Sequence, residues 1–397
     1  MTLLDDVKFL ATANSFKAGV LYSIKPDDGS CDLPITRSTT ATRVDPSGII
    51  ETVAVNAPQI DYSDGCGCFL IEPVVTNLHL YSEEIDNAAY SKSDVTVTAN
   101  AITSPDGTTN ADECETTGTG AQMYQTISLA ASKTYTWSFY VKRGTMTDIG
   151  QQIFNMDGDG EYGTGGKYYS QTTASGWTRV SFTFTTGSNG GNTRFYPINS
   201  SGVTGTIYLW GFQLEQHTAD NIMQSSYIKT TSGTVTRNPT SFIKTGVSGT
   251  IGSTEGTLFG EIAFPHNGTS TTSEQNLLGI HNSNDSSLVH IGKWGTSAIG
   301  FIRKDGGSNV LFSFDQAISS GAYIKQAIRY KAGDHSYWKD GSEIATSTDS
   351  TAINATQDRI VSSFTGISSF WEFYGKIRTL QVYNTALTDA QLTSLTS

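Results

Sequence analysis

Charged side chains are scarce in this sequence. Asp, Glu, Lys and Arg make up 16% of the 397 residues, whereas an ordinary soluble domain carries about 25%. The 25 Lys and Arg are outnumbered by 37 Asp and Glu, which leaves a formal net charge of -12. Such a chain repels phosphate backbones and has no basic stripe to bind them. We therefore expect no nucleic-acid partner.

Long apolar runs are also missing. No window approaches the roughly 18 consecutive apolar residues of a membrane-spanning helix, so membrane insertion is not expected. Asp5 and Asp6 stand where a secretory signal is basic, and no sustained apolar stretch follows them. Four cysteines, with Cys66 and Cys68 separated by one glycine, form neither a disulfide framework nor a zinc pattern. These features indicate plain thiols, no export signal and synthesis in a reducing cytoplasm.

Catalytic signatures are absent too. The sequence holds no G-x-S-x-G elbow, no H-E-x-x-H and no P-loop, and its six histidines are dispersed. Glycoside hydrolysis needs two carboxylates about 5 to 10 Å apart, which sequence alone cannot pair. We therefore expect no enzyme, with an active depolymerase as the open alternative.

The residues that are plentiful favour β-sheet and turn. Gly reaches 40, Tyr 18 and Phe 18, and the length corresponds to two or three domains. The predicted fold class is all-β: an irregular N-terminal leader followed by two antiparallel, jelly-roll-like β-sandwiches. The expected domains are a docking leader over 1–75, a sandwich over 76–237 and a second sandwich over 238–397.

Alternating apolar residues carry this prediction. In the segment 135–141, Tyr135, Trp137, Phe139 and Val141 share one face, as in a half-buried strand. The segment 206–214 is apolar on both faces, which is typical of a central strand. Near the end of the chain, Thr388 and Gln391 have the spacing of a capping box and predict a short terminal helix.

Several segments, in this order, resemble bacteriophage virion proteins that carry a carbohydrate-binding-module-like sandwich. They are RSTTATRVDPSGIIETVAVNAPQIDYSDG, FLIEPVVTNLHLYSEE, AAYSKS, SPDGTTNAD, YTWSFYVKRG, WTRVSFTFT, YLWGFQLEQ and SSYIKTTSGTVTRN. The sequence departs from that family at Gln59, where an arginine is usual. The segments SYWKDGSEIA and GKIRTLQVYNTALTDAQLTSL resemble a concanavalin A-like, laminin-G-like domain.

The resemblance implies a protein of the virion surface with two lectin-like sandwiches, on a head or tail appendage. Our interpretation is non-catalytic adhesion to host-surface or mucus glycans. The leader would contact other virion proteins, and a homo-oligomer, with a trimer favoured, would multiply weak sites. Assembly in the host cytoplasm fits the missing export signal. The alternative is a purely structural head-fibre, capsid-decoration or tail-assembly subunit without a glycan ligand.

Sugar binding needs accessible aromatic faces with polar groups beside them. Trp137 and Trp210 lie in strongly apolar strands and are expected in the core. Better candidates point to the opposite side of a strand from its core residues, or lie in a Gly-rich segment. Others belong to the second sandwich, where one of the pair 337/338 is expected to be exposed. These carbohydrate-binding candidates are Tyr140, Tyr162, Tyr168, Tyr169, Trp294, Tyr337 and Trp338.

The most acidic loop offers oxygen ligands at alternate positions, as a calcium loop does. Its candidate metal ligands are Asp157, Asp159 and Glu161. The loop fails the EF-hand pattern, because Tyr162 and Tyr168 occupy the places of the required Gly and Glu. Ca²⁺ is thus the one cofactor considered, with a solvated turn as the alternative.

Overall fold

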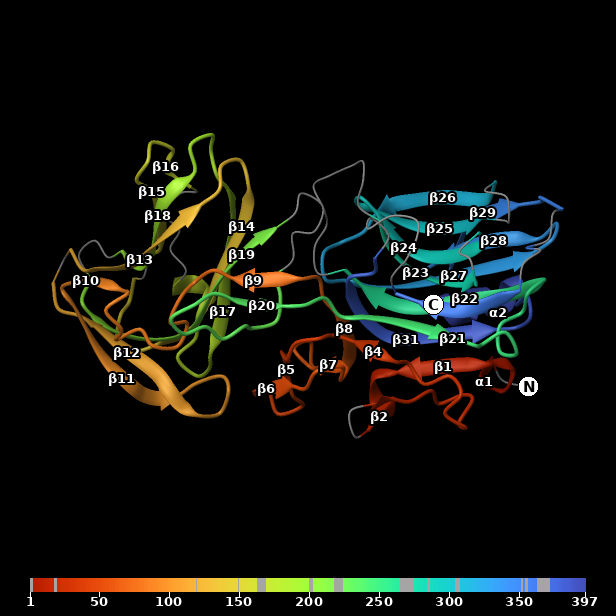
Figure 1. Ribbon diagram of the computed structural model, residues 1–397, viewed down its shortest axis with the longest axis horizontal. Helices are drawn as coiled ribbons and strands as arrows, with labels where there is room; N and C mark the ends of the chain where they lie inside the picture. Colours follow the sequence, from red (N-terminus) through yellow and green to blue (C-terminus); the bar gives the residue numbers. More distant parts are fainter. Residues whose placement is uncertain are drawn as a thin grey trace. The chain divides into compact units, whose positions relative to one another are not determined.

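The computed structural model (Figure 1) describes residues 3–17, 20–118, 120–148, 150–162, 169–199, 203–217, 224–264, 275–283, 286–303, 308–350, 353, 356–362 and 372–397. These residues form almost entirely antiparallel β-structure, and the predicted all-β fold class is confirmed. The chain divides into two compact units. Unit 1 comprises Met1–Pro46, Val53–Pro73 and Asn238–Ser397, and unit 2 comprises Ser47–Thr52 and Val74–Arg237.

Unit 2 is a sandwich of two five-stranded antiparallel sheets. The first sheet runs in the order β10 (Ser91–Ser93), β13 (Gln122–Leu129), β18 (Gly191–Asn199), β15 (Gln152–Asn155) and β16 (Gly160–Glu161). The second runs in the order β11 (Val95–Thr103), β12 (Thr109–Thr116), β19 (Gly205–His217), β14 (Thr134–Arg143) and β17 (Thr178–Thr185). One hydrophobic cluster draws residues from both sheets.

The alternation in β14 builds this core as predicted. Tyr135, Trp137, Phe139 and Val141 are all buried in the cluster. The central strand β19 is buried along most of its length, also as predicted. A bulge interrupts its pairing with β14 at Gly211, whose φ of 69° suits a residue without a side chain.

Unit 1 is also built on two antiparallel sheets. The first contains β29 (Ser342–Ser347), β28 (His335–Lys339), β27 (Tyr323–Lys331), β22 (Glu255–Ala263), β31 (Gly375–Tyr383), β8 (Cys68–Ile71) and β7 (Gln59–Asp61), with β1 (Phe9–Thr12) also paired to β31. The second contains β26 (Asn309–Ala317), β25 (Ser297–Arg303), β24 (Leu288–Trp294), β23 (Gln275–Asn282), β30 (Gln357–Val361), β21 (Ser241–Thr245) and β4 (Ile35–Thr36).

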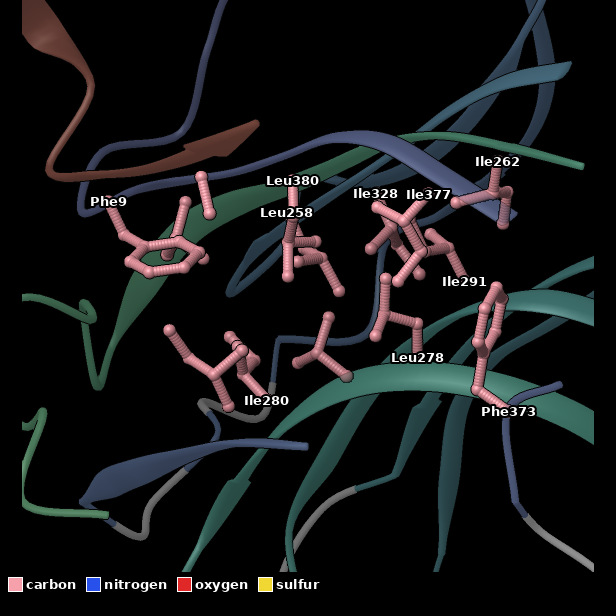
Figure 2. Close-up of a cluster of buried hydrophobic side chains, with 14 of the residues drawn as sticks. Phe9, Leu258, Ile262, Leu278, Ile280, Ile291, Ile328, Phe373, Ile377 and Leu380 are labelled. Carbon is pink, nitrogen blue, oxygen red and sulfur yellow. The ribbon is translucent and has the colours of Figure 1, made fainter. Parts of the chain in front are cut away.

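Apolar side chains from the two sheets of unit 1 meet in one large cluster. Leu258 and Leu380 come from the first sheet, and Leu278 and Ile280 from the second (Figure 2). Burying each such side chain contributes about 1.5–3 kcal/mol. The cluster is therefore the main stabilising element of this unit.

The structure divides the first 75 residues differently from the expected separate leader. Strand β1 pairs with β31, β8 extends the same sheet, and β4 pairs with β21, so these strands belong to unit 1. Phe9, Ile60 and Phe69 are buried in the cluster of that unit. The leader has too few apolar residues for a core of its own, and its short strands bury them against residues 238–397 instead.

The terminal helix α2 (Asp389–Thr396) begins at the predicted cap. The Thr388 hydroxyl accepts from the Gln391 amide, and the Gln391 side chain accepts from the Thr388 amide, which completes the capping box.

None of the described helices is long and apolar enough to cross a membrane. The remaining short elements are α1 (Leu3–Asp6), the 3-10 turns Ala13–Ser15 and Tyr169–Gln171, β2 (Phe16–Lys17), β3 (Val20–Leu21), β5 (Ala41–Val44), β6 (Ile50–Val53), β9 (Val75–Asn77) and β20 (Val235–Arg237).

Candidate functional site

The outer surface of the first sheet of unit 2 carries polar and aromatic side chains together. Met123, Ile153 and Phe195 of β13, β15 and β18 point into the core, so their neighbours along each strand point away from it. We call this surface the polar–aromatic face. Its residues are Gln122, Tyr124, Gln152, Phe154, Glu161, Arg194, Tyr196 and Asn199.

The strand register arranges this face in rows. Thr126 pairs with Arg194, Arg194 with Phe154, and Phe154 with Glu161. Paired residues share a face of the sheet, and adjacent strands lie about 4.8 Å apart. This row therefore places a guanidinium, an aromatic ring and a carboxylate one after another across the strands. A second row joins Tyr196 to Gln152.

Two tyrosines hold the Arg194 guanidinium in place. Its central carbon lies 4.6 Å from the centre of the Tyr124 ring, and its terminal nitrogen donates to the Tyr196 hydroxyl at 3.4 Å. The two tyrosine rings contact each other with centroids 4.8 Å apart. The hydrogen bond to Tyr196 raises the pKa of Arg194 above its usual value. Arg194 is thus a fixed, permanent cation.

A line of side-chain amides continues the face. Gln122 donates to Asn199 at 3.2 Å, and Asn199 donates to Gln152 at 2.9 Å. Glu161, at the edge of the sheet, is exposed. The half-buried Phe154 ring offers a surface for stacking against the C–H groups of a sugar, while the amides, Arg194 and Glu161 can bind its hydroxyls.

The sequence-predicted residues of unit 2 lie elsewhere, apart from Glu161. Tyr140 is half-buried on the opposite sheet, where its ring packs at 5.5 Å against Trp210 and 6.5 Å against Tyr227. Tyr162 is 8% exposed and stacks on Phe184. Tyr168 lies outside the described residues, and only the backbone of Tyr169 is described, in a 3-10 turn.

The three predicted calcium ligands do not come together, because within the described ranges no group of three or more acidic, His or Cys side chains could hold a metal ion. Asp159 instead accepts hydrogen bonds from the Tyr162 hydroxyl at 2.7 Å and the Gly190 amide at 3.0 Å. These bonds, led by that of Tyr162, lower the pKa of Asp159. Asp157 accepts from the Asn192 amide at 2.6 Å. The two aspartates thus tie their loop to the adjacent turn, and a calcium site at this loop stays a prediction.

In unit 1 the expectation that one of Tyr337 and Trp338 is exposed is wrong. Tyr337 is fully buried between the sheets, and Trp338 is 5% exposed on the opposite side of its sheet. There it is covered by Leu387, just before α2, and by Leu392, within α2. Trp294 is half-buried, with its ring 5.3 Å from that of Phe312.

Sequence reasoning missed Tyr124, Phe154, Arg194 and Tyr196. Their signal is present as short alternations in which polar or aromatic residues flank core residues, as in Gln122–Thr126 and Arg194–Tyr196. Each alternation predicts only one strand. The pairing of strands that are distant in sequence is needed to bring the residues together.

A comparison with protein families finds a likeness for most of unit 2. Residues 87–199 match the family described as a carbohydrate binding domain. This segment of unit 2 is therefore similar to a carbohydrate-binding module. The matched range contains every residue of the polar–aromatic face.

Comparisons with whole proteins and solved structures give weaker likenesses. No curated protein matches the sequence. A carbohydrate-binding module of a Ruminococcus gnavus sialidase is 20% identical, with a TM-score of 0.30, and the match covers 37% of this chain and 84% of that one. Domain 4 of a Geobacillus stearothermophilus arabinanase, solved with arabinotriose, is 14% identical with a TM-score of 0.31, over 46% and 85% of the chains. A pentraxin from Limulus polyphemus is 16% identical with a TM-score of 0.31, over 36% and 70%.

Proposed function

We propose that the protein is a non-catalytic adhesin that binds glycans on the polar–aromatic face of unit 2. The carrying observation is the row of Arg194, Phe154 and Glu161 within the range that matches a carbohydrate binding domain. An aromatic ring with polar donors and acceptors on both sides is suited to a sugar ring with its hydroxyls at the edges. The amide line of Gln122, Asn199 and Gln152 extends the polar surface beside it.

The residues of this face act as a binding surface through their different chemistry. Phe154 stacks on the sugar, Glu161 accepts hydrogen bonds from hydroxyls, and Arg194 donates to sugar oxygens. The tyrosines fix Arg194 before the ligand arrives, which lowers the entropy lost on binding. The core beneath the sheet keeps the backbone rigid.

Replacing Phe154 by alanine is expected to weaken binding at least about tenfold, which corresponds to about 1.4 kcal/mol. Affinity electrophoresis or a glycan array with the full chain measures the loss. Tyr208→Ala is the matched control, because Tyr208 is a half-buried aromatic residue on the opposite sheet and is expected to leave binding unchanged. Equal binding by wild type and Phe154→Ala would remove this face from consideration.

We further propose that the adhesin belongs to the surface of a bacteriophage particle and acts as a homo-oligomer, with a trimer favoured. The ordered sequence segments that resemble virion proteins support this setting, and virion proteins are the proposed partners. Several linked copies raise apparent affinity by about 10² to 10⁴ without any new contact. A cryo-EM map of the intact particle tests the setting: density for the chain on a head or tail appendage is expected, and its absence from the particle would refute it.

A further inference from the structure

Among the residues that the structure describes, Arg194 is a cation without an acidic partner. The described part of the chain provides no ion pair to it; its contacts there are the Tyr124 ring and the Tyr196 hydroxyl. By contrast, Arg329 pairs with Asp334 and Asp389, and Arg378 pairs with Glu261. A positive side chain held rigidly on a binding surface and left uncompensated is a receptor for an anion.

The other charge of the face is too distant to compensate Arg194. Glu161 lies two strands away, with Phe154 between them, which is a separation of about 10 Å between strand positions. At physiological salt this distance exceeds the Debye length of about 8 Å. Arg194 and Glu161 therefore act on opposite edges of a sugar that is stacked on Phe154.

We propose that the glycan bound by this face is acidic, and that a carboxylate or sulfate group of the sugar pairs with Arg194. This inference rests on the proposed glycan-binding function. The guanidinium, stacked on Tyr124, presents the planar fork that binds two oxygens of one anionic group. The buried Tyr196 accepts from Arg194 through its hydroxyl and so holds the guanidinium in this orientation. Glu161 repels an anion at its edge and so fixes the orientation, with neutral hydroxyls on its side.

A glycan array that groups its members as neutral, carboxylated and sulfated tests the inference with the full-length protein. Binding is expected to favour acidic members and to fall as salt rises, because the ion pair is partly exposed. A preference for uronate and sialate members identifies a carboxylate, and a preference for sulfated members identifies a sulfate ester. Equal binding of neutral and acidic members overturns the inference but leaves glycan binding intact. Silence of the whole array overturns the proposed function itself.

Arg194→Gln is expected to lower affinity for the acidic members about ten- to hundredfold and to abolish their advantage over neutral members. Arg194→Lys keeps the charge without the fork and is expected to retain part of the preference. Lys8→Gln, which removes an exposed positive charge from unit 1, is the control and is expected to keep both the affinity and the preference for acidic members. An unchanged acidic preference in Arg194→Gln, with circular dichroism like that of the wild type, would show that another residue binds the anion.

Discussion

Replacing Trp137 by alanine is expected to lower the free energy of unfolding of unit 2 by about 3–5 kcal/mol. Trp137 is fully buried at the centre of the sandwich. Its ring lies 4.9 Å from Phe139, 5.4 Å from Phe195 and 6.2 Å from Phe212, measured between centroids. Phe195 belongs to the opposite sheet, so the truncation leaves a cavity that neither sheet can fill without moving the other.

Urea unfolding followed by circular dichroism measures this loss, because the signal does not depend on the removed tryptophan. Trp137→Phe keeps most of the volume and is expected to be milder. Trp177→Ala is a second control, since Trp177 is only half-buried and donates one hydrogen bond to the Thr103 carbonyl. A Trp137→Ala protein that unfolds at the wild-type urea concentration would contradict the central place given to this ring.

Local patterns were sufficient where one strand or one helix end determines the outcome. Period-two alternation placed Trp137 and Phe139 in the core, and side-chain spacing alone predicted the cap at Thr388. The cap depends on two side chains that are near in sequence. The buried face of the strand needs only an apolar interior to pack against. Burial is then a property of the pattern itself.

Long-range pairing decided the features that sequence could not predict. Tyr124 and Tyr196 lie on β13 and β18, whose register is shifted by an irregularity between Met123 and Gln125. Trp338 is covered by residues near the C-terminus, although its own strand looks half-exposed. Strand β1 likewise depends on a strand more than 300 positions away, as the pairing of Phe9 with Val382 shows.

A charged network lies inside unit 1. Arg37 is fully buried and donates to the carbonyls of Thr39 at 3.0 Å and Ala54 at 2.6 Å, and to the Gln59 side chain at 3.0 Å. Gln59 in turn donates to the buried Glu72 carboxylate at 2.7 Å. Gln59 stands where the resembling virion proteins usually have arginine. Here the Gln59 side chain accepts a hydrogen bond from Arg37 and donates one to Glu72. A second guanidinium could only donate.

Arg37→Leu is expected to lower the free energy of unfolding of unit 1 by about 3–5 kcal/mol, because it leaves the buried Gln59 side chain without its cationic donor and the buried Glu72 carboxylate, which Gln59 links to Arg37, without this cation. Arg37→Lys keeps the charge but not the fork, so an intermediate loss is expected. Urea unfolding of the full chain measures both variants. Glycan binding serves as the internal control, because the polar–aromatic face lies entirely in unit 2 and is expected to bind as in the wild type. Wild-type stability of Arg37→Leu would mean that the leader strands are held by their apolar residues alone.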